Sequence, residues 1–139
     1  MIPDRRLRPF LTLLVAAALG SFGCGGPFLL FPGGALSGEV VEEPVESWEF
    51  VDTTFIDIET RPEDPYSVTL NYTQQDGQLY IDPAEGREWL NHIREDPALR
   101  VRVGDRLYPV RAVLVAEPGH TLEGFDTTRF IYRLESRTP

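Results

Sequence analysis

Residues 99–112 read Leu-Arg-Val-Arg-Val-Gly-Asp-Arg-Leu-Tyr-Pro-Val-Arg-Ala, and this stretch decides the fold class. Apolar and charged residues alternate over 99–103, which is the period of a strand with one buried face. Gly104-Asp105 then supplies a turn, and 106–117 reads as a long second strand. Pro109 within it predicts a sheet edge or a bulge, because proline cannot donate to a ladder. The stretch therefore predicts an antiparallel hairpin.

The same kind of pattern recurs on both sides of this hairpin. Alternation, or a run of β-branched and aromatic residues, predicts strands at 54–60, 66–73, 78–81 and 128–135. Asp76-Gly77, between the second and third of these strands, is a dipeptide typical of two-residue hairpin turns. Successive hairpins in one short chain predict a small closed or half-open antiparallel barrel of about six strands, since closure protects the edge strands.

One helix interrupts the strands, at about residues 83–95. Residues 82–85 (Asp-Pro-Ala-Glu) combine an N-cap acid, a proline at the first helical position and an acid at the third. Trp89 and Ile93 are four residues apart and Leu90 lies beside them, so one side of the helix is apolar. We expect Trp89 to cover the sheet. The predicted fold is mainly β with one covering helix.

The composition limits what the chain can bind. Its 139 residues suit one domain, and its single cysteine excludes an intramolecular disulfide framework and a cysteine-rich zinc site. The net charge is −9, and residues 39–64 hold ten acids against Arg61 alone. Because nucleic-acid binding needs a basic face, no nucleic-acid partner is expected. We interpret the acidic segment as a solvated face. Repulsion from anionic membrane surfaces, or a weak site for divalent cations, is the alternative.

The first 23 residues are typical of a secretory signal peptide. Several arginines precede an apolar run over 10–19, which is too short to span a bilayer permanently. Residues 21–24 (Ser-Phe-Gly-Cys) resemble the lipobox of bacterial lipoproteins, in which the cysteine is acylated and becomes the new N-terminus. By that resemblance Cys24 is the lipidation site, and Gly25 favours the periplasmic face of the outer membrane. An ordinary signal peptide, or an uncleaved anchor with an incidental cysteine, is the alternative.

Residues 24–38 are expected to form the lipidated cysteine and a tether, with the barrel domain at 39–139. Glycine and proline punctuate the tether at both ends. Its apolar tetrad at 28–31 (Phe-Leu-Leu-Phe) either packs on the domain or dips into the bilayer beside the lipid, and we favour packing.

Few residues carry recognisable chemistry. His92 has no second metal ligand at helical spacing and His120 is distant in the chain, so no metal site is expected. No Gly-x-Ser-x-Gly motif indicates a nucleophile, and no catalytic residue is assigned. Arg100 and Arg102 share one strand face, where they either help to bind an anion or balance the acidic segment.

Three stretches together resemble a known family: residues 79–81 (Leu-Tyr-Ile), 87–93 (Arg-Glu-Trp-Leu-Asn-His-Ile) and 96–112, which contains the hairpin quoted above. They are similar to the split-barrel flavin-binding superfamily, and most to its branch of deazaflavin-dependent nitroreductases and quinone reductases, kin to pyridoxamine 5'-phosphate oxidase. The resemblance spans about residues 54–116. It implies a split β-barrel, which is commonly a homodimer in this superfamily.

The resemblance also implies a cofactor site. By it, Arg61 and Arg87 would contact the phosphate of FMN or a deazaflavin, while Tyr80 and Trp89 would line the ring pocket. The family's phosphate loop corresponds here to residues 60–65, which carry two acids that would repel a phosphate.

Two hypotheses therefore stay open. The favoured one is a membrane-anchored envelope lipoprotein whose barrel is a non-catalytic binding or scaffold module without a cofactor. The alternative is a flavin- or deazaflavin-dependent reductase of quinone or nitro substrates.

Overall fold

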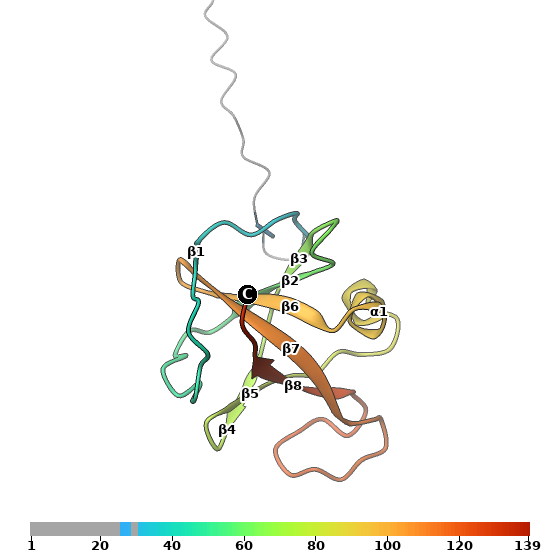
Figure 1. The fold of residues 1–139 in the computed structure, drawn as a ribbon. Helices are drawn as coiled ribbons and strands as arrows, with labels where there is room; N and C mark the ends of the chain where they lie inside the picture. The colour runs from blue at the N-terminus through green and yellow to red at the C-terminus, as the bar shows by residue number, and fades with distance from the viewer. Residues whose placement is uncertain (1–25, 29–30) are drawn as a thin grey trace, which may run out of the picture.

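A computed structural model describes residues 26–28 and 31–139 of the chain (Figure 1). Within these residues the predicted mainly β fold, a small antiparallel split barrel with a single helix, is confirmed. In the described ranges no helix is long and apolar enough to cross a membrane. The elements are β1 (Glu39–Val40), β2 (Ile56–Thr60), β3 (Tyr66–Leu70), β4 (Thr73–Gln75), β5 (Gln78–Ile81), α1 (Glu88–Glu95), β6 (Ala98–Val103), β7 (Arg106–Ala116) and β8 (Ile131–Ser136).

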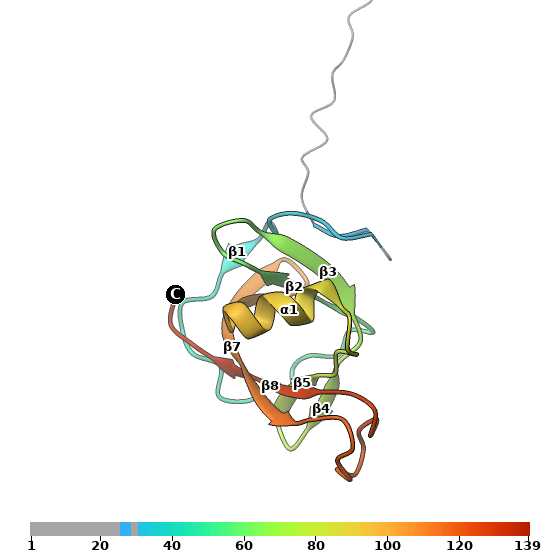
Figure 2. The same ribbon diagram turned by 90° about the vertical axis from the view of Figure 1, so that its right-hand side faces the viewer.

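The strands follow the order β3-β2-β6-β7-β8-β5-β4, and β1 pairs separately with β7. The two end strands, β3 and β4, are consecutive in the chain and are separated only by Asn71 and Tyr72. The single strand predicted at 66–73 is therefore bent into two, of which one pairs with β2 and the other with β5. This bend brings the chain round into the ring of strands seen in Figure 2, so the sheet closes through the backbone itself.

Both predicted hairpin turns are present. Asp76 and Gly77 have φ angles of 52° and 72°, the two positive values of a type I′ turn. Gly104 has a φ of 62° between β6 and β7. These turns fix the register of the hairpins that they join.

Pro109 lies within β7, opposite Arg100 of β6, and not at a bulge. Its carbonyl accepts a hydrogen bond from the backbone N–H of Arg137, on the side of β7 away from β6. The ring nitrogen of Pro109 faces the same side. On that side β7 pairs with β1 up to Leu107 and with β8 from Val110 onward, so Pro109 lies between the two pairings. The missing N–H therefore costs no ladder bond. The bulge lies between Leu114 and Ala116 instead.

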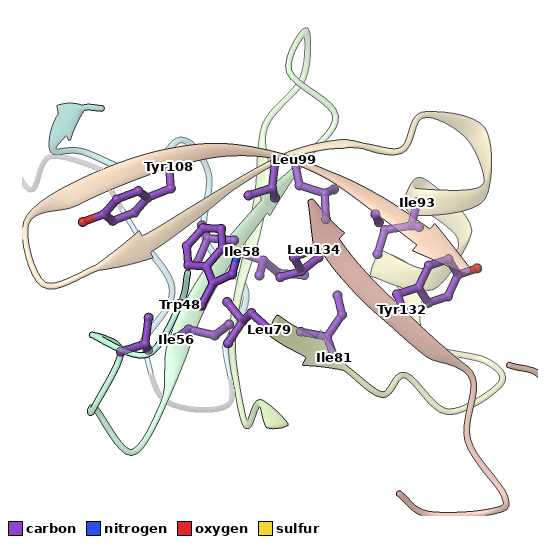
Figure 3. Packing of buried hydrophobic residues seen from close by; sticks show 14 of the residues in the cluster. Trp48, Ile56, Ile58, Leu79, Ile81, Ile93, Leu99, Tyr108, Tyr132 and Leu134 are labelled. Carbon is purple, nitrogen blue, oxygen red and sulfur yellow. The ribbon is translucent and has the colours of Figure 1, made fainter. Parts of the chain in front are cut away.

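The interior of the barrel is filled by apolar side chains from every side (Figure 3). Small barrels are normally filled in this way, so the centre is a packed core and not a binding cavity. Burying such side chains is the main source of stability in a domain of this size. The residues labelled in Figure 3 are Trp48, Ile56, Ile58, Leu79, Ile81, Ile93, Leu99, Tyr108, Tyr132 and Leu134.

Helix α1 lies across one open end of the ring (Figure 2). It begins at Glu88, not at 83, and the predicted Asp82 capping box is wrong. Gly86 has a φ of 88°, which breaks the helical path, and the N-cap residue Arg87 makes no side-chain cap bond. Leu90 and Ile93 are buried in the core, whereas Trp89 is only half-buried at its margin. The expectation that Trp89 covers the sheet is therefore met only in part.

Residues 33–41, most of which were predicted to be a tether, lie flat on the barrel and are called the strap below. Gly33 and Ser67 of β3 exchange two backbone hydrogen bonds of 2.9 Å, and the Ser67 hydroxyl donates to the Gly34 carbonyl at 2.7 Å. At its other end the strap forms β1, which pairs in parallel with the start of β7. The strap therefore crosses from the α1 end of the barrel to the opposite end.

The strap covers a charged face of the sheet. The Glu59 carboxylate is 3% exposed and accepts two hydrogen bonds of 2.8 Å from Arg100 and one of 2.7 Å from the Leu36 N–H. Two residues along the same strand pair, the Asp57 carboxylate and the Arg102 guanidinium form a second ion pair, with their closest atoms 2.6 Å apart. The two strand arginines thus balance acids of the 39–64 segment, as one of the two interpretations held.

We expect Glu59→Gln to lower the free energy of unfolding by about 1.5–3 kcal/mol, because it weakens the charged hydrogen bonds that this buried carboxylate accepts from Arg100 and from the Leu36 N–H. Urea denaturation measures this loss, and the double variant Glu59→Gln/Arg100→Met is the control. The double variant should be more stable than the single one. If Glu59→Gln had the same free energy of unfolding as the unaltered protein, the role given to this carboxylate would be contradicted.

Candidate functional site

A cavity of about 470 Å³ lies at the N-terminal end of α1 and is called cavity 1. Its walls come from β3, from the turn that precedes α1, from the loop before β8 and from the residues just before the strap. A volume of this size suits a small ligand. The lining residues are Phe31, Pro32, Tyr66, Val68, Thr69, Leu70, Asn71, Asp82, Ala84, Gly86, Arg87, Glu88, Trp89 and Arg129.

Arg87 and Trp89, two of the four expected cofactor residues, meet in cavity 1. The start of the helix places them there: Leu90, His92 and Ile93 take the inward side, whereas Arg87 and Trp89 at the start line the cavity. Tyr66 of β3 and Phe31 add two further aromatic residues to the wall.

The charges around cavity 1 cancel. Arg87 and Arg129 supply two positive groups, and Asp82 and Glu88 supply two negative ones. Burial raises the pKa of Asp82 from its ordinary value of 3.8, and the nearby positive charge of Arg129 offsets part of this rise. The wall therefore holds a carboxylate that is poorly solvated when ionised.

Arg61 lies in a different place. It follows β2 with a φ of 54°, its guanidinium is 3.5 Å from the Asp64 carboxylate, and it lies over the ring of Tyr66 at 5.8 Å. It lines a second cavity of about 440 Å³ along α1, which shares only Glu88 with the lining of cavity 1. Arg61 and Arg87 are therefore not brought to one pocket.

Tyr80 points away from both cavities. Its neighbours on β5, Leu79 and Ile81, are fully buried, so alternation sends Tyr80 to the outer face of the barrel. There its ring contacts that of Phe125, with the centroids 5.1 Å apart. Of the four expected cofactor residues the structure joins only Arg87 and Trp89, and their role in cofactor binding stays a prediction.

Asp82, Tyr66 and Arg129 are among the polar lining residues that sequence reasoning missed. Asp82 was interpreted as a helix cap, and Tyr66 and Arg129 as ordinary strand positions. Their sequence pattern gives no signal, because cavity 1 forms only where the turn before α1 meets β3 and the loop before β8.

His92 belongs to a buried polar cluster of another kind. Its Nδ1 lies 2.8 Å from the Thr60 hydroxyl and its Nε2 lies 3.3 Å from a Glu88 oxygen. The order Thr-His-Glu has the outline of a catalytic triad, but Thr60 is fully buried and no substrate can reach its hydroxyl. The cluster ties α1 to β2. Among residues 26–28 and 31–139 no group of three or more potential metal ligands occurs.

The comparisons with known proteins concern the fold. No family model and no curated protein matches the chain. Among solved structures it is similar to a putative pyridoxamine 5'-phosphate oxidase from Listeria innocua, with a TM-score of 0.47 and 8% identity. That match covers 62% of this chain and 86% of the other.

We expect Asp82→Asn to be more stable than the unaltered protein near pH 7. Because the folded-state pKa of Asp82 is raised, ionisation opposes folding above that pKa, and the penalty disappears as the pH falls toward 3.8. The stability difference, measured by urea denaturation, should therefore vanish in acid. Equal stability of the two proteins at neutral pH would contradict the burial of this carboxylate.

Asp126→Asn is the matched control with the opposite sign. Hydrogen bonds from Thr128 lower the pKa of Asp126, so its ionised form favours folding above its ordinary pKa and loses that effect in acid. This variant should be less stable at neutral pH.

Proposed function

We propose that this protein is a bacterial cell-envelope lipoprotein, held by an acylated Cys24 at the periplasmic face of the outer membrane. Its split barrel would be a non-catalytic binding or scaffold module. The proposal has two parts, the anchor and the barrel, and separate observations support them.

Two observations support the second part: Arg61 is separated from Arg87, and Asp82 and Glu88 offset the two arginines of cavity 1. A cofactor phosphate is held by positive groups that converge on it, as bidentate guanidinium groups do. Arg61 and Arg87 line different cavities, and Arg61 already faces Asp64. With Tyr80 on the outer face as well, these residues do not fit a flavin phosphate and ring as one site.

The leader and the strap support the anchor. A positive n-region, an apolar run and the lipobox-like 21–24 precede Cys24. The strap begins at Gly33, nine residues after Cys24, and its hydrogen bonds hold it on the barrel. An acyl group on Cys24 would therefore hold the folded barrel close to the membrane.

Cavity 1 favours the alternative function, a flavin- or deazaflavin-dependent reductase. It surrounds a space of about 470 Å³ with two guanidinium groups and three aromatic residues, Phe31, Tyr66 and Trp89. A bound flavin would supply hydride chemistry, and this chain would only bind and orient it.

Labelled palmitate fed to cells that produce the full chain should enter the protein, because acyl transfer to Cys24 forms a covalent bond. Cys24→Ala should carry no label. An unlabelled wild-type protein, or label that survives in Cys24→Ala, would overturn the anchor.

Titration with FMN should give no saturable binding, since Asp82 and Glu88 balance the two arginines of cavity 1 and Arg61 lines the other cavity. The measurement is the flavin fluorescence of the purified, detergent-extracted protein, with Arg87→Glu as the test variant and the exposed Arg106→Glu as its control. Saturable binding that Arg87→Glu abolishes and Arg106→Glu retains would favour the reductase.

A further inference from the structure

Phe28 and Phe31 form an exposed apolar pair immediately before the strap. Their side chains are 71% and 70% exposed, the highest values among the large exposed apolar residues of the described chain. Phe28 N–H donates to the Phe31 carbonyl at 3.0 Å, and Phe31 N–H donates to the Phe28 carbonyl at 2.9 Å. Residues paired in this way present their side chains on the same face. The predicted packing of the apolar tetrad on the domain is therefore wrong for these two phenylalanines, and residues 29–30 lie outside the described residues.

The position of the pair in the chain limits where it can lie. Phe28 lies four residues after Cys24, and an extended chain of that length reaches about 14 Å at most. If Cys24 carries acyl chains in the bilayer, Phe28 cannot leave the neighbourhood of the headgroups. The choice for both rings is then between water and the membrane interface, and the removal of apolar surface from water favours the interface.

Two further features agree with this location. Residues 25–38 contain no charged side chain, so this segment carries no group that an anionic headgroup would repel. Phe31 lies two residues before Gly33, whose two hydrogen bonds to Ser67 fix it on β3. A phenylalanine held in the interface would therefore orient the barrel as well as add affinity.

We propose that Phe28 and Phe31 insert into the phospholipid interface beside the acylated Cys24 and hold the barrel with its β3 and α1 end toward the membrane. This inference rests on the proposed anchor. Because Phe31 also lines cavity 1, that cavity opens next to the membrane surface.

The single cysteine of the chain allows a direct test. In the acylated protein the Cys24 thiol is blocked, so Phe31→Cys introduces a unique thiol for an environment-sensitive fluorophore. Phe55→Cys is the matched control: Phe55 is also exposed, but it precedes β2, whose other end at Thr60 contacts α1. Each full-length, detergent-extracted protein is labelled and reconstituted into vesicles of phosphatidylethanolamine and phosphatidylglycerol.

The label at position 31 should emit at shorter wavelength in vesicles than in water and should lose most of its emission when the vesicles contain nitroxide-labelled lipid. The label at position 55 should do neither. Water-like emission at position 31, or an equal shift at both positions, would overturn the insertion while leaving the anchor intact. Labelling of the wild-type protein would show a free Cys24 thiol and would overturn the anchor together with the inference.

Discussion

The carboxylate of Glu59 is the contact on which the arrangement of the molecule depends. It sits at the junction of β2, β6 and the strap, where it accepts bonds from Arg100 and from the Leu36 N–H. A carboxylate removed from water at 3% exposure is tolerated only if its lone pairs are satisfied. The strap supplies one of the required donors, so folding of the barrel and docking of the strap are parts of one event.

The elements that could be predicted are those whose signals are local. The alternation over 99–103 and the Asp76-Gly77 turn act within a few residues, and both appear as expected. The break of β3 at Asn71 could not be predicted, because it depends on the sheet closing round on itself. The observed starts of α1 and β8 also differ from the predicted ones. Gly86 adopts a positive φ before α1, and the Asp126 side chain holds Thr128 in a turn before β8.

The candidate site was harder to predict than the fold. Arg87 and Trp89 were found together because they are close in the sequence and share the start of one helix. Arg61 and Tyr80 were grouped with them through a family resemblance, which fixes neither side-chain direction nor local charge. Asp64 draws the guanidinium of Arg61, and strand alternation turns Tyr80 outward. The side of a strand on which a residue lies, or the charge beside it, is therefore enough to separate residues that the family resemblance assigns to one site.

The strap also determines how the molecule would bear a mechanical load. A pull on the chain from the Cys24 side reaches the barrel first at Gly33 and Ser67, then at Glu59, and last at the parallel pair of β1 and β7. The bonds would therefore yield one after another, as in peeling, and not all together. Freeing residues 33–38 would release at most about 20 Å of extended chain before the load reached β1.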